Sequence, residues 1–134
     1  MKVNGACHCG AIAFEAEVDA ARVTLCHCTD CQVLTGTAYR TTVPASAESF
    51  VLNRGRPSTY VKTTAESGRP RLHAFCGTCG TPIYSAALEN VTSYGLRVGC
   101  LAERASLAPS RQIWRRSALR WSDSIEHLPG RATE

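Results

Sequence analysis

The order of apolar and polar residues predicts a chain of short β-strands. Residues 12–17 place Ile12, Phe14 and Ala16 at every second position, with two glutamates among the residues between them. This period-two alternation is the pattern of a strand that buries one face. Residues 94–98 repeat the pattern shortly before Cys100. Both segments are therefore expected to be strands with one side in the core.

Short β-favouring runs separated by turn residues predict the other strands. We expect these strands over residues 22–25, 39–43, 50–52, 59–63, 71–75 and 82–86. Pro44 should end the second run, and residues 66–70 indicate an exposed loop because they contain a glycine and a proline. The predicted fold class is mainly β.

The segment 110–121 allows two structures. Trp114, Ala118 and Trp121 have helical spacing and lie among arginines, which describes a basic amphipathic helix able to bind nucleic acid. The plainer alternative is a strand over 112–115 followed by a tryptophan that caps the core. We favour the strand.

Length and charge place few limits on function. The 134 residues fit a single domain spanning 1–134, because single domains commonly contain about 100–150 residues. The net charge of +4 is mild, so no nucleic-acid partner is required. All basic residues except Lys2 and Lys62 are arginines, whose planar guanidinium suits small carboxylate or phosphate ligands. A genome rich in arginine codons would give the same bias.

The start of the chain predicts its location. The first cysteine cluster follows Met1 almost at once, which leaves no room for a secretory hydrophobic segment. No apolar run approaches the about 18 residues of a membrane span. We therefore expect a cytoplasmic protein with no membrane partner, in which cysteine clusters bind metal more often than they form disulfides.

All cysteines except Cys100 fall into three tight clusters. These clusters are Cys7/Cys9, Cys26/Cys28/Cys31 and Cys76/Cys79. A closed tetrahedral zinc site takes four ligands, and the first and third clusters together supply that number. The middle cluster supplies three, which is the protein ligand count of a metal with a vacant position.

The two outer pairs predict a structural zinc site. Two-residue spacing lets a tight turn aim Cys76 and Cys79 at one ion, and Gly77 and Gly80 permit the positive φ values that such turns often need. Zinc held by Cys7, Cys9, Cys76 and Cys79 would connect the first strand to the middle of the chain.

The middle cluster allows an open or a closed site. Cys26, Cys28 and Cys31 are expected where a strand end runs into a short helical turn, with Asp30 near its start. Three thiolates on Zn²⁺ carry a net charge of −1 and leave one position for water or a thiol, whose pKa zinc lowers. The alternative is a second structural zinc completed by Cys100, His27 or another side chain. Thiolates also suit Cu(I) or an iron–sulfur cluster, but the Cys-x-Cys pair favours zinc.

The other candidate groups give weaker signals. His8 and His27 lie between cysteines, so their side chains should point away from the metals, and His73 is expected to be a packing residue on a strand. No paired carboxylates, Ser/His/Asp set or phosphate-binding loop is recognisable. His27, Asp30 and Tyr39 are near the middle cluster in sequence, but none of them is identified as a general base.

At three motifs the chain resembles the glutathione-dependent formaldehyde-activating enzyme (GFA) family, which also contains centromere protein V. The motifs are Gly5-Ala6-Cys7-His8-Cys9-Gly10, Cys26-His27-Cys28-Thr29-Asp30-Cys31 and Phe75-Cys76-Gly77-Thr78-Cys79-Gly80. The resemblance implies a β-tent fold of small antiparallel sheets stapled by zinc. It also implies a structural zinc on the outer cysteines and a catalytic zinc on Cys26, Cys28 and Cys31, where the thiol of glutathione engages.

The resemblance leads to a functional hypothesis. Members of the family add glutathione to formaldehyde and form a carbon–sulfur bond, so we expect a zinc-dependent carbon–sulfur lyase with two zinc ions per chain. Its partners would be a small thiol such as glutathione and an aldehyde. The alternative is a non-enzymatic, zinc-stabilised module that binds nucleic acid or protein, which the arginine-rich tail favours.

Overall fold

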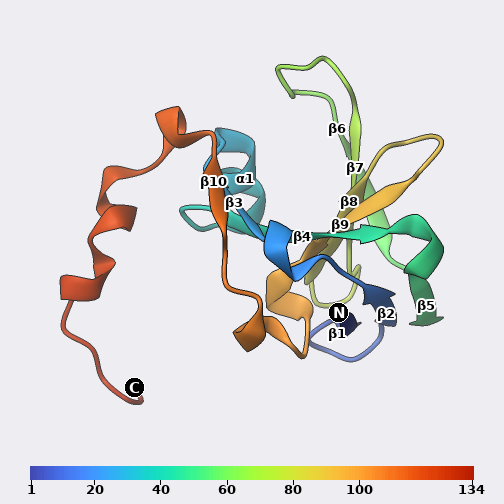
Figure 1. The fold of residues 1–134 in the computed structure, drawn as a ribbon, viewed down its shortest axis with the longest axis horizontal. Coiled ribbons are helices and arrows are strands. Elements are labelled where there is room, and N and C mark those ends of the chain that lie inside the picture. Colours follow the sequence, from blue (N-terminus) through green and yellow to red (C-terminus); the bar gives the residue numbers. More distant parts are fainter.

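The computed structural model of the chain describes residues 1–134 and confirms a mainly β fold (Figure 1). The smaller sheet is antiparallel, has the strand order β1-β2-β5, and is formed by β1 (Lys2–Ala6), β2 (Ala13–Glu17) and β5 (Val51–Arg54). The larger sheet has seven strands in the order β10-β3-β4-β9-β8-β7-β6. Its strands are β3 (Thr24–Cys26), β4 (Arg40–Ser46), β6 (Ser58–Lys62), β7 (Arg71–Phe75), β8 (Pro82–Ala86), β9 (Ser93–Arg97) and β10 (Arg111–Ile113). Only β10 pairs in parallel, with β3.

One α-helix and seven short 3₁₀ turns complete the chain. The helix α1 (Thr29–Thr35) ends at Gly36, whose φ of 68° is the left-handed conformation that glycine adopts easily at a helix end. The turns are η1 (Ala20–Arg22), η2 (Ala47–Ser49), η3 (Val98–Cys100), η4 (Arg104–Ser106), η5 (Arg115–Ser117), η6 (Arg120–Asp123) and η7 (Ile125–His127).

The hydrophobic core lies between the small sheet and one face of the large sheet. Phe14 of β2 is buried together with Val43 of β4, Ile83 of β8 and Leu96 of β9. Burial of side chains of this size contributes about 1.5–3 kcal/mol each. The alternation of residues 12–17 is confirmed, because Phe14 points into the core while both glutamates of β2 remain accessible.

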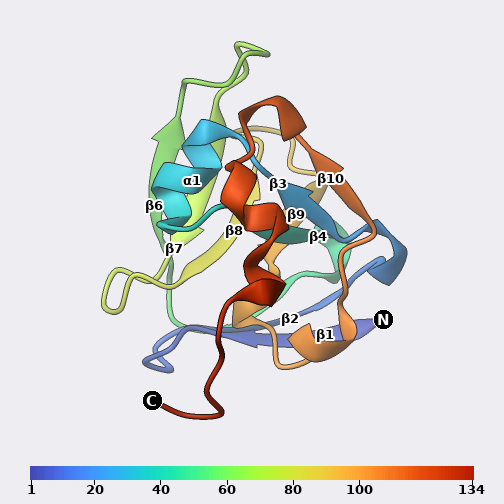
Figure 2. The ribbon, with the colours of Figure 1, turned by 90° about the vertical axis from the view of Figure 1, so that its left-hand side faces the viewer.

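The opposite face of the large sheet is polar and positions the middle cysteine cluster. Cross-strand partners project to the same side of a sheet. Cys26 pairs with Arg40 and Thr42 with Arg97, so all four side chains lie on the face opposite Val43. Helix α1 packs on this side, beside β3 and close to β6 (Figure 2).

Pro44 does not end its strand as expected, because β4 continues to Ser46. Pro44 lies opposite Gly95 of β9, and its carbonyl accepts a hydrogen bond from the Asp19 amide, at 3.3 Å, on the other side of the strand. The N–H that proline lacks would point to that same side. Its absence therefore removes no hydrogen bond between β4 and β9.

The strand prediction for the tail is confirmed in part. β10 ends at Ile113, and three 3₁₀ turns follow it in place of a continuous helix. Trp121 is 59% exposed, so the prediction that a tryptophan here caps the core is wrong. Figure 1 shows that the red C-terminal segment runs outside the sheets.

Candidate metal centres

The outer cysteines are presented by two tight turns. Cys7 and Cys9 follow β1, and the amide of Gly10 donates to the Cys7 carbonyl at 3.0 Å. Cys76 and Cys79 follow β7, where the amide of Gly80 donates to the Cys76 carbonyl at 2.8 Å. Gly10 and Gly80 have φ values of 77°, which supports the prediction for Gly80. Gly77 has no positive φ, and the space for a Cβ there is occupied by Ser58.

The four outer thiols fit a tetrahedral zinc ion. Their sulfur atoms all lie within 4.8 Å of one another, and Cys9 Sγ is 3.6 Å from Cys7 Sγ and 3.7 Å from Cys76 Sγ. Zinc–sulfur bonds of about 2.3 Å in tetrahedral geometry place neighbouring sulfurs about 3.8 Å apart. All eight cysteines are free thiols. The residues present therefore fit one closed zinc site.

Hydrogen bonds favour the ionised form of two outer thiols, Cys7 and Cys79. The pKa of Cys9 is instead raised to about 11, because contacts with the other thiols, Cys7 first among them, outweigh the hydrogen bond from the Ala11 backbone. The Ile12 amide donates to Cys7 Sγ at 3.2 Å. The Thr81 hydroxyl lies 3.1 Å from Cys79 Sγ and accepts from the His8 amide at 3.0 Å, so its proton is available to the thiol. The Thr81 hydroxyl, together with backbone donors, lowers the pKa of Cys79 to about 5. A thiolate is the form that binds metal.

The middle cysteines meet where β3 passes into α1, as the sequence predicts. Cys26 is the last residue of β3, Cys28 caps the helix and Cys31 lies in its first turn. The three sulfur atoms are within 4.8 Å of one another, and no other Cys, His, Asp or Glu ligand atom belongs to the group. This donor set fits a metal that is held by three protein ligands.

The middle thiols ionise unequally. Hydrogen bonding from the Cys26 thiol, with a smaller contribution from the neighbouring Arg40 guanidinium, lowers the pKa of Cys31 to about 5. The same contact with Cys31 raises the pKa of Cys26, and burial raises that of Cys28. One negative charge is thus favoured in the cluster before a metal binds.

The alternative ligands for the middle site have other partners. His27 is buried, and its Nε2 atom lies 2.7 Å from Gln112 Oε1. The Cys100 thiol donates to the Arg97 carbonyl at 3.2 Å and belongs to neither cysteine group. Asp30 accepts from Thr64 at 2.7 Å and pairs with Lys62 at 3.0 Å.

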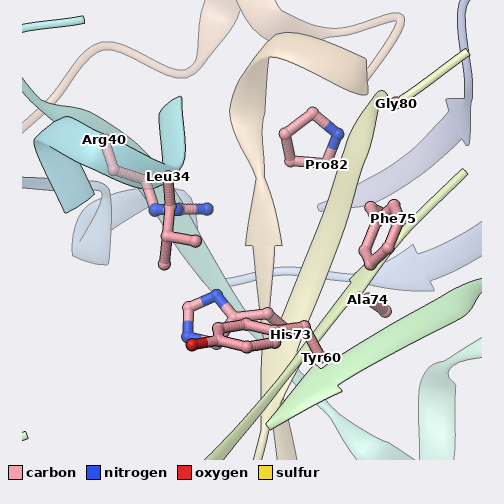
Figure 3. Close-up of a pocket in the computed structure, with 8 residues that line it drawn as sticks. All are labelled: Leu34, Arg40, Tyr60, His73, Ala74, Phe75, Gly80 and Pro82. Carbon is pink, nitrogen blue, oxygen red and sulfur yellow. The ribbon is translucent and has the colours of Figure 1, made fainter. Parts of the chain in front are cut away.

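Two cavities border the helix α1. One of about 460 Å³ is lined by Cys28, Asp30 and the tail residues Trp114 and Arg116. The other, of about 410 Å³, lies between α1 and the strands β6, β7 and β8 (Figure 3). Its polar lining consists of Arg40, Tyr60 and His73. Sequence reasoning did not identify Arg40 or Tyr60 and treated His73 as a packing residue, because only strand register shows that they share a face.

The fold and the two cysteine clusters define a mainly β protein with one four-thiol and one three-thiol group, each of which could hold a metal ion. The family model described as glutathione-dependent formaldehyde-activating enzyme matches residues 2–117. The chain belongs to this family, as the three motifs predicted. A crystal structure of a Rhodobacter sphaeroides protein is similar, with 25% sequence identity and a TM-score of 0.63, over 84% of this chain and 99% of that one. No helix is both long and apolar enough to cross a membrane.

Proposed function

We propose that this protein is a zinc-dependent carbon–sulfur lyase that joins or separates a small thiol and an aldehyde. The observation that carries the proposal is the group of three thiols, Cys26, Cys28 and Cys31, which has no fourth protein ligand and borders a cavity. Membership of the family adds that the activity depends on glutathione or a related thiol. Residues 1–134 would form one domain of this type.

The reaction joins two molecules without oxidation or reduction. The thiol sulfur forms a bond to the aldehyde carbon, the carbonyl π electrons move to oxygen, and the thiol proton ends on that oxygen. A zinc ion held by Cys26, Cys28 and Cys31 would supply a Lewis acid that stabilises a substrate thiolate. The outer site would hold the second zinc and have a structural role.

The chain's own residues prepare the site for this chemistry. Cys28 accepts a hydrogen bond from the Cys31 amide at 3.3 Å, which fixes the thiol at the start of α1. Gln32 donates from its amide to the carbonyls of His27 and Ser117, both at 2.9 Å, and so connects the helix to the turn η5. These contacts keep the loop that contains Cys28 in one conformation.

The proposed reaction can be tested by following thiol–aldehyde exchange at equilibrium. Purified zinc protein should speed the exchange of formaldehyde with its glutathione adduct, measured by NMR saturation transfer and corrected for the rate without protein. Cys28→Ser should reduce the rate to the uncatalysed value. An exchange rate that does not depend on the protein, tested with several small thiols and aldehydes, would contradict the proposal.

The binding-module alternative receives less support. Arg115 forms a two-bond ion pair with Asp123, at 3.0 and 2.9 Å, and Arg116 pairs with Glu66. These carboxylates neutralise part of the positive charge that binding to a phosphate backbone would need.

We also propose a cytoplasmic location, since eight free cysteines suit a reducing compartment.

A further inference from the structure

Two buried arginines on the polar face of the large sheet have no carboxylate partner. The exposed fractions of Arg40 and Arg97 are 5% and 6%, and neither forms an ion pair with an acidic residue. The Nε atoms of both are buried without a hydrogen-bond partner. Burying a charge without a counter-charge is costly. The pair therefore needs an explanation.

His73 holds Arg97 in place without neutralising it. Arg97 Nη2 lies 3.1 Å from His73 Nδ1. Burial and the neighbouring cations, Arg97 first among them, lower the pKa of His73 to about 4. The ring is therefore neutral at pH 7, and Nδ1 must accept from the guanidinium. This leaves the proton on Nε2 and makes His73 a second donor on the same face.

The charges nearby do not balance the two guanidinium groups. Asp30, in the first turn of α1, already pairs with Lys62 at 3.0 Å. A zinc ion with three thiolates would have a net charge of −1, and Cys31, which attracts both Arg40 and Arg97, can offset only one of the two guanidinium charges. One positive charge remains on a face that also carries Arg71, which lies opposite Lys62 in the sheet.

Of the two arginines, Arg40 lines the cavity of about 410 Å³. Figure 3 shows Arg40 and Leu34 on one side of the cavity, with Phe75 and Pro82 on the other and His73 beside Tyr60. A second hollow of about 240 Å³ contains Arg40 and Arg97 together. Arg40 thus lines both hollows and lies between the Cys31 thiol and the apolar wall formed by Phe75 and Pro82.

We propose that this cavity binds the carboxylate of the substrate, with Arg40 as its charge partner, and that the protein therefore prefers anionic thiols to neutral ones. Arginine suits this role because its planar fork can donate two parallel hydrogen bonds to one carboxylate. The proposal rests on the proposed function, because it places the thiol of the same molecule at Cys26, Cys28 and Cys31.

The first experiment compares two thiols on the unmodified zinc protein. 3-Mercaptopropionate and 3-mercaptopropan-1-ol have similar size, but only the first carries a carboxylate. Isothermal calorimetry at pH 7 should give a dissociation constant at least about tenfold lower for the anionic thiol, the range expected for a charged hydrogen bond. Propionate, which has no thiol, should compete with it. Equal affinities of the two thiols would overturn the proposal.

The second experiment assigns the preference to Arg40. Arg40→Gln should abolish the difference between the thiols, and Arg40→Lys should retain part of it. Arg56→Gln removes the same charge from an exposed turn and should behave as the unmodified protein. Circular dichroism and zinc content will show whether each variant is folded. A preference that survives in folded Arg40→Gln would overturn the assignment.

The outcomes separate this inference from the proposed function. If both thiols bind with equal affinity and Cys28→Ser abolishes their binding, the proposed thiol site is supported and the carboxylate site is contradicted. If propionate binds and neither thiol does, the carboxylate site is supported and the proposed thiol site is contradicted. If none of the three probes binds, both proposals fail.

Discussion

The sulfur atoms of Cys9 and Cys76 lie 3.7 Å apart, although 67 residues separate them in the chain. Cys9 follows a strand of the small sheet and Cys76 follows a strand of the large one. A zinc ion bound between them would therefore join the two sheets at the edge of the core.

Cys76→Ser should leave the chain largely unfolded at 25 °C. Structural zinc contributes about 10–16 kcal/mol in small zinc-finger peptides, which exceeds the net stability of many domains, about 5–15 kcal/mol. Cys76 is also buried in the core. Far-UV circular dichroism and zinc analysis will measure the loss, and a variant that keeps its fold and two zinc ions would contradict the structural role.

Cys28→Ser should stay folded, lose one zinc ion and lose activity. Cys28 is only half-buried, at a helix cap, and links no separate sheets. Cys100→Ser is the matched control, because Cys100 lies outside both ligand groups and should retain two zinc ions. Metal analysis by mass spectrometry will count them. A single zinc in the folded unmodified protein would contradict the two-site hypothesis.

Thr81→Val should make the outer site release zinc at a higher pH. The Thr81 hydroxyl lowers the pKa of Cys79 to about 5, and protons compete with zinc for thiolates. Removing the hydroxyl raises that pKa, so the thiol becomes protonated earlier as the pH falls. Acid titration with a zinc indicator will measure the release midpoint. Thr78→Val, in the same turn and exposed, should leave the midpoint unchanged.

Gly55→Ala should destabilise the protein more than Gly68→Ala. Both glycines have positive φ, 76° and 71°, which costs another residue about 1–2 kcal/mol. A Cβ at Gly55 would also collide with the Ala11 carbonyl, whereas at Gly68 it would meet open space. We expect an additional cost of about 1–3 kcal/mol at Gly55. Urea unfolding will measure both, and equal values would contradict the collision.

Local patterns predicted most of the strands and the four-thiol group. β7 and β8 occupy the residues expected for them, because turn residues and cysteine knuckles mark their ends. Local patterns could not predict that β4 continues through Pro44 or that Trp121 is exposed. Whether a proline interrupts pairing depends on which neighbour its missing N–H would face, and whether a tryptophan is buried depends on the surface available to cover it.

The sequence by itself determined which cysteines form each cluster, the mainly β class and the family, since these depend on residue type and short spacing. Only the tertiary structure decided that Arg40 lies opposite Cys26 and that Arg97 shares its face. Strand register sets these neighbours, and register depends on pairing between segments that lie far apart in the chain. The same pairing brings His73 to the cavity, although nothing in the sequence marks His73 as a functional residue.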